Sequence, residues 1–185
     1  FMETFPNWSP DGRYLYFCRA PQLKPDFDLE REYRKIKYDL MRIAYNPDTE
    51  EWGELETLVS AGETKLSCSQ PRVSPDGTFL LFCMAEYGNF PIFQLSSDLY
   101  LMTLENQKFQ RLAMNSDAPE GFHCWSSNSR WIVFTSKRDN GLFTRLYFSY
   151  INDNGIAQKP FILPMTKPDD YQTMFKAFSV PELIK

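Results

Sequence analysis

The sequence has only one histidine, His123, among its 185 residues. Zinc and haem sites usually draw on several histidines or on Cys-x-x-Cys pairs, and the four cysteines form no such pair. These absences predict that the chain binds neither a metal nor another cofactor. We interpret the cysteines, Cys18, Cys68, Cys83 and Cys124, as buried thiols.

A surplus of positive charge and long apolar segments are also missing. The 20 lysines and arginines are outnumbered by 24 aspartates and glutamates, so nothing favours binding to the phosphates of a nucleic acid. The longest apolar runs, such as residues 14–18 and 79–85, are much shorter than the roughly 20 residues that cross a bilayer. We therefore expect neither a nucleic-acid partner nor a membrane span. Because Phe1 opens the chain without a signal segment, we also expect that the native N-terminus has been removed.

An internal repeat organises what the sequence does contain. Ser-Pro-Asp-Gly at positions 9–12 and 74–77 precedes the apolar segments 14–18 and 79–83, and a third, eroded copy, Ser-Ser-Asn-Ser at 126–129, precedes segment 131–135. Proline presets the backbone of a tight turn, aspartate bonds its own backbone and glycine accepts a positive φ, so each copy predicts a hairpin. In the third copy Ser129 replaces glycine. Asn128 or Ser129 must then adopt a left-handed conformation at a cost of about 1 kcal/mol, and we expect a distorted turn.

The segments after these turns are apolar on both faces, which predicts sheets that stack on one another like the blades of a propeller. Third strands are expected near residues 39–41, 98–100 and 145–147, and fourth strands at 55–59, 109–113 and 161–163. The predicted fold is all-β: a β-propeller fragment of three four-stranded antiparallel blades, at 6–60, 68–114 and 123–163, within one segment that spans residues 1–185.

Two short helices are also predicted. Tyr171, Met174, Phe175 and Phe178 recur at helical spacing after an acidic start, which indicates a helix from about 170 to 178 in the C-terminal tail. We expect this helix to dock on the flank of the propeller, since amphipathic helices usually bury their apolar stripe on their own domain; binding to a partner is the alternative. One or two further helical turns are expected within residues 26–37.

The Trp-Ser-Pro-Asp-Gly pattern at 8–12, with the aromatic-rich strand behind it, resembles the repeat of TolB-like (WD-repeat-like) bacterial propellers. The departures are Val73 in place of tryptophan in the second copy, and Ser127 and Ser129 in place of proline and glycine in the third. The resemblance implies a ring of six or seven blades, a periplasmic or envelope location and action through protein contacts. Because three blades do not close a ring, we expect the missing blades to come from an upstream part of the chain or, alternatively, from a second copy.

The loops on one face of such a propeller are the predicted ligand-binding surface, because recognition residues gather on loops that a rigid scaffold positions. These tentative site residues are Tyr87, Phe90, Phe93, Asp117, His123, Lys137 and Arg138. No catalytic residue is assigned. His123 and Cys124 are neighbours in a predicted strand and point to opposite faces, so they cannot act as a dyad, and a structural role for His123 is the favoured reading.

These patterns lead to three hypotheses of function. The first is a non-catalytic module that binds a protein or peptide. The alternative is a propeller cap or propeller enzyme that acts on peptides or glycans, motivated by the aromatic loop 87–93 and by His123. The third is a structural spacer. No Gly-x-Ser-x-Gly motif is present, so the chain is not itself the hydrolase half of a capped serine peptidase, although it could be part of the cap.

Overall fold

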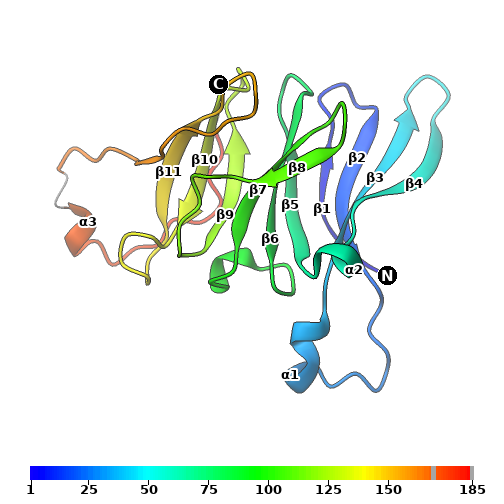
Figure 1. The fold of residues 1–185 in the computed structure, drawn as a ribbon, viewed down its shortest axis with the longest axis horizontal. Coiled ribbons are helices and arrows are strands. Elements are labelled where there is room, and N and C mark those ends of the chain that lie inside the picture. Colours follow the sequence, from blue (N-terminus) through cyan, green and yellow to red (C-terminus); the bar gives the residue numbers. More distant parts are fainter. Residues whose placement is uncertain (168–169, 184–185) are drawn as a thin grey trace.

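Three four-stranded antiparallel sheets, each built from consecutive strands, make up the fold (Figure 1). The computed structural model describes residues 1–167 and 170–183. The first sheet contains β1 (Met2–Trp8), β2 (Tyr14–Ala20), β3 (Asp39–Asn46) and β4 (Glu51–Val59). The second contains β5 (Ser67–Val73), β6 (Phe79–Ala85), β7 (Asp98–Thr103) and β8 (Lys108–Arg111), and the third contains β9 (Glu120–Trp125), β10 (Trp131–Ser136), β11 (Arg145–Tyr150) and β12 (Phe161–Ile162). This arrangement confirms the predicted fold class.

The turn after the first strand of each sheet is closed by the same set of hydrogen bonds. The serine hydroxyl donates to the side chain two residues on, over 2.5 Å from Ser9, 2.6 Å from Ser74 and 2.6 Å from Ser126. The same serine oxygen accepts the amide of the residue five positions later, at 2.9 Å in all three turns. Serine, rather than proline, is therefore the residue that ties each turn to the start of the next strand. Ser129 has a φ of 59°, which confirms the left-handed residue predicted for the third turn.

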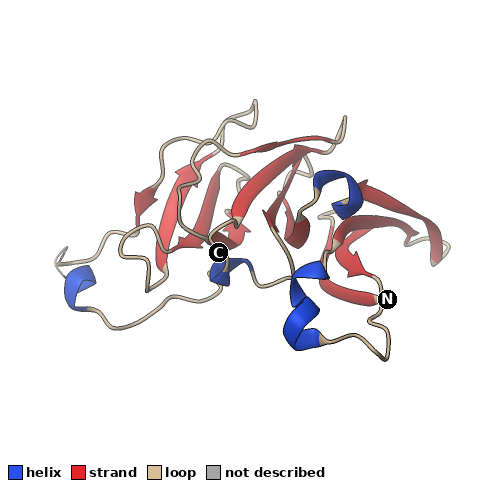
Figure 2. Ribbon diagram, turned by 60° about the horizontal axis from the view of Figure 1, so that its bottom comes forward, coloured by secondary structure: helices blue, strands red, loops and turns tan. Residues whose placement is uncertain are grey.

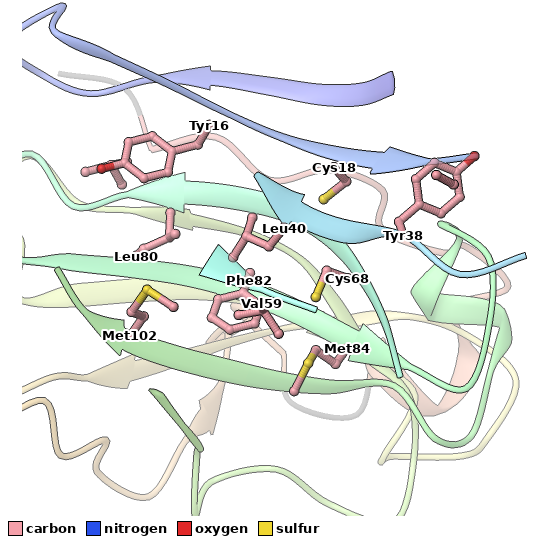
Figure 3. Close-up of a cluster of buried hydrophobic side chains, with 12 residues drawn as sticks. Tyr16, Cys18, Tyr38, Leu40, Val59, Cys68, Leu80, Phe82, Met84 and Met102 are labelled. Atoms are coloured by element: carbon pink, nitrogen blue, oxygen red, sulfur yellow. The ribbon is translucent and has the colours of Figure 1, made fainter. Parts of the chain in front are cut away.

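The second sheet is covered on both faces. On one side Leu80, Phe82 and Met84 pack against Tyr16, Cys18 and Leu40 of the first sheet (Figure 3). On the other side Phe79, Leu81 and Cys83 pack against residues of the third sheet that include Trp125, Ile132 and Phe134. This double burial explains why β6 is apolar at nearly every position, and it confirms the stacking predicted from the sequence. All four cysteines are free and buried, as predicted.

The helices lie outside the sheets. Within residues 26–37, α1 (Leu29–Glu32) and the 3-10 turn η1 (Tyr33–Lys35) are confirmed, and two further short helical segments are α2 (Ala61–Thr64) and η2 (Pro91–Phe93). In the tail, α3 spans only Asp170–Thr173, so the prediction of a helix to residue 178 was wrong in its length. No helix in the ranges 1–167 and 170–183 is long and apolar enough to cross a membrane.

Competition for the backbone explains the short tail helix. The buried Arg145 guanidinium donates to the carbonyls of Tyr171, Met174 and Lys176, at 3.1, 3.0 and 2.5 Å. The amide of Phe178 donates to Thr144 O on the third sheet instead of to a helical partner. The tail thus docks on the flank of the third sheet, as predicted, but mostly without regular secondary structure.

Candidate functional site

The three sheets converge at their first strands, because β5 contacts both β1 and β9. Each of these strands carries a bulge, in which two residues stand opposite a single residue of the neighbouring strand. The bulged pairs are Phe5 with Pro6, Gln70 with Pro71 and Phe122 with His123. Their first members have φ values of 55°, 55° and 46°, so a non-glycine residue is left-handed at the same place in every sheet. Such strained residues concentrate at functional sites.

A pocket of about 250 Å³ lies where the bulges meet. We call it the axial pocket, and its lining residues are Phe5, Pro6, Gln70, Pro71, Arg72, Phe122, His123 and Val180. Every sheet contributes its bulged pair, and Val180 comes from the tail. The walls are largely apolar, and Arg72 supplies the positive charge.

Hydrogen bonds between sheets hold the bulges in place. Gln70 Oε1 accepts the amide of Phe122 at 2.8 Å, and Asn7 Oδ1 accepts the amide of Val73 at 3.0 Å. A bulge leaves a strand amide without its partner in the ladder, and at Phe122 a side chain of the preceding sheet supplies the acceptor. Asn7 links the first two sheets in the same way, two residues after the second bulge. The shape of the axial pocket is therefore fixed by contacts between sheets.

His123 lines the axial pocket but is only 2% exposed. Its Nε2 lies 3.2 Å from Leu81 O, to which it donates, and its Nδ1 lies 3.7 Å from Cys83 Sγ. Burial lowers the pKa of His123 to about 3, and burial next to the Glu120 carboxylate raises the pKa of the Cys83 thiol. The imidazole is therefore neutral and the thiol protonated at neutral pH, so this pair joins the second and third sheets instead of forming an activated nucleophile.

The predicted loop-face residues do not form one cluster. Phe90 and Phe93 are exposed, at 61% and 75%, and the Lys137 ammonium lies 5.3 Å from the ring centre of Phe93. Tyr87 is half-buried and packs edge-on against Tyr33.

The remaining predicted residues lie elsewhere. Asp117 is exposed. Arg138 pairs at 2.8 Å with the fully buried Glu120, whose carboxylate also accepts the hydroxyls of Ser116 and Ser136. The structure thus brings Phe93 and Lys137 together and places His123 in the axial pocket.

Sequence reasoning missed Phe5, Gln70, Pro71 and Arg72 as members of a site. A signal was available, because Pro6 and Pro71 stand at the same position before the two intact turns. Proline inside a strand marks a bulge or an edge. The left-handed Phe122 carries no comparable mark in the sequence.

Comparison with solved structures identifies the architecture. A prolyl endopeptidase is 15% identical, with 87% of this chain covered and a TM-score of 0.53. The chain has a β-propeller fold. A luciferin-regenerating enzyme is also similar, at 12% identity, with 87% of this chain covered and a TM-score of 0.51. The propeller segment spans 22% of the endopeptidase chain and 60% of the luciferin-regenerating enzyme chain.

The comparisons also correct the sequence analysis. Both similar structures are enzymes, and this finding contradicts the expectation of a non-catalytic binding module. At such low identity the likeness shows the fold alone. Neither a protein-family model nor a curated protein sequence matches the chain.

Proposed function

We propose that this chain is the propeller part of an enzyme that acts on peptides, and that it serves as a cap over the reacting site. The observation that carries the proposal is the axial pocket, to which all three sheets contribute strained, inward-facing residues. The shared fold with a prolyl endopeptidase supports the same reading.

The lining of the axial pocket favours a peptide over a glycan. Phenylalanine and proline side chains form its walls, and Arg72 adds a single cation. Apolar walls with one placed charge fit an extended peptide, which can present an apolar and a charged side chain on the same side. A glycan needs many hydrogen-bonding groups, and most of the lining residues lack a polar side chain.

The cap role follows from the state of His123. Its ring nitrogens face Leu81 O and Cys83 Sγ inside the core, so it is not available as a general base. The chain would select the peptides that reach the reacting site, and the catalytic groups would come from another part of the protein.

The test compares the turnover of peptides and oligosaccharides by the full-length protein as its gene encodes it. Filling the axial pocket with Phe122→Trp should lower kcat/KM for internally quenched peptides about ten-fold, equivalent to about 1.4 kcal/mol. The control Phe109→Trp, on the outer strand β8, should leave it unchanged. Turnover of oligosaccharides alone would favour the glycan alternative, and turnover of neither substrate would reject the proposal.

We further propose that the chain belongs to a larger ring of the TolB-like type. Trp8 and Trp125 stand at the same position of the repeat, yet Trp8 is 45% exposed and Trp125 only 8%. Trp125 is covered because it stacks on Phe79 of the preceding sheet and donates to Arg72 O. The corresponding face of the first sheet, with Leu15, Phe17, Ile43, Trp52 and Leu55, lines an apolar recess of about 520 Å³.

A further sheet would cover that recess as the second sheet covers Trp125. The upstream part of the protein is the source we favour for this sheet, and a second copy of the chain is the alternative. The sequence resemblance adds a periplasmic or envelope location to this proposal, and cell fractionation tests it.

A further inference from the structure

From α3 the tail runs back toward the middle of the molecule (Figure 2). Val180 forms part of the pocket lining. Two residues later, Glu182 Oε1 pairs with Arg72 Nη2 at 3.0 Å, and the amide of Leu183 lies 3.2 Å from Cys124 Sγ. Residues 180–183 therefore touch β5 and β9 where the sheets converge.

The end of the tail has no regular secondary structure. No helix or turn is present from 174 to 183, and in an extended chain the side chains of residues i and i+2 point to the same side. Val180 and Glu182 thus meet the apolar wall and the cation of the pocket together. Because Pro181 restricts Val180 to extended conformations, the segment is already shaped for binding.

We infer that the axial pocket is a subsite for an extended peptide with an apolar residue followed, two positions later, by a carboxylate. Residues 180–183 lie at its edge as an intramolecular ligand, where Val180 lines it and Glu182 pairs with Arg72. The inference rests on the proposed function, since it names the peptide class that the enzyme accepts. A peptide that pairs its carboxylate with Arg72 must displace Glu182.

The contacts of the tail are suited to such exchange. The side chains of Arg72 and Glu182 are 38% and 56% exposed, and ion pairs of this kind are weak. Arg145 anchors the tail further upstream, at residues 171–176. The segment 180–183 can therefore detach while the tail stays on the third sheet, which keeps the local concentration of the internal ligand high.

The test measures binding of a fluorescent peptide with the sequence of residues 178–183 to the whole protein by anisotropy. Glu182→Gln weakens the internal ligand and should raise the affinity for the peptide about two- to five-fold. Glu54→Gln, an exposed glutamate of β4, is the matched control and should leave the affinity unchanged. Equal affinities of the two variants would overturn the inference.

A peptide with glutamine at the position of Glu182 completes a double-substitution cycle. Unsubstituted protein should prefer the glutamate peptide about two- to five-fold, and Arg72→Gln protein should bind both peptides equally. The peptide exchange needs no protein variant, so misfolding cannot imitate the result. An unchanged preference in Arg72→Gln protein, or no binding to Glu182→Gln protein, would also overturn the inference.

These measurements detect binding and not turnover. Cleavage without binding of this peptide rejects the subsite alone. Binding without any cleavage by the full-length protein rejects the proposed function and leaves the subsite in place.

Discussion

Ser129 shows how one residue can offset its own backbone strain. It holds the glycine position of the third turn with a φ of 59°. Its hydroxyl oxygen accepts the amide of Asp76 at 2.9 Å, which links the turns of the second and third sheets. A glycine would remove the strain, but it would also remove this contact between sheets.

Two substitutions separate these effects. Ser129→Ala keeps the strained backbone and loses the acceptor, so the free energy of unfolding should fall by about 1–2 kcal/mol. Ser129→Gly loses the same acceptor but relieves the strain, and it should be more stable than the alanine variant by about 1 kcal/mol. Urea unfolding followed by tryptophan fluorescence measures both values. Equal stability of the two variants would show that the backbone is not strained.

His123 makes stability depend on pH. Burial lowers its folded pKa from 6.5 to about 3, so the unfolded chain binds a proton in this range that the folded chain does not. The contribution of neutral His123 to the free energy of unfolding is complete above pH 6.5. It is lost as the pH falls toward 3, by up to about 1.4 kcal/mol per pH unit. His123→Gln should flatten the stability curve between pH 6.5 and 5. A variant curve as steep as that of the original protein would assign the dependence to other groups.

At the scale of elements, Arg145 decides the conformation of the tail. Its guanidinium is fully buried and donates to three tail carbonyls. Arg145→Met keeps much of the side-chain volume but removes the donors. The amide of Phe178, which donates to Thr144 O, should then exchange with solvent much faster, while the amides of β10 stay protected.

Hydrogen exchange followed by mass spectrometry measures this difference. Arg130→Met is the control, because Arg130 makes an exposed ion pair with Asp153 and should not affect the tail. Unchanged protection at Phe178 in Arg145→Met protein would mean that other contacts hold the tail.

The elements that the sequence predicts well are those with local causes. The turns at 9–12 and 74–77 carry their own hydrogen-bonding groups, and β6 is apolar because both faces are covered. The length of the tail helix was overestimated, because the spacing of its apolar residues does not reveal that Arg145 donates hydrogen bonds to the tail carbonyls. Most of the axial pocket was missed for a similar reason. The left-handed Gln70 and Phe122 are joined by a hydrogen bond between two sheets, and the two residues are 52 positions apart in the chain. The loop-face ligand site remains a prediction.

At the scale of the whole molecule, the sheets differ in how completely they are covered. The second sheet has a neighbour on each face, whereas the first sheet presents its recess to solvent. Trp52 in the recess and Trp8 beside it are 52% and 45% exposed. In a stack that continues around an axis, each sheet has two neighbours. The central claim is therefore that another sheet covers this recess in the complete protein.

Hydroxyl-radical footprinting of the tryptophans tests this claim most directly. It compares residues 1–185 alone with the full-length protein, at dilutions where each is monomeric by sedimentation. Trp8 and Trp52 should be oxidised in the isolated chain and protected in the full-length protein, as Trp125, 8% exposed, is in both. Equal oxidation of Trp8 and Trp52 in the two proteins would contradict a propeller that continues beyond the first sheet.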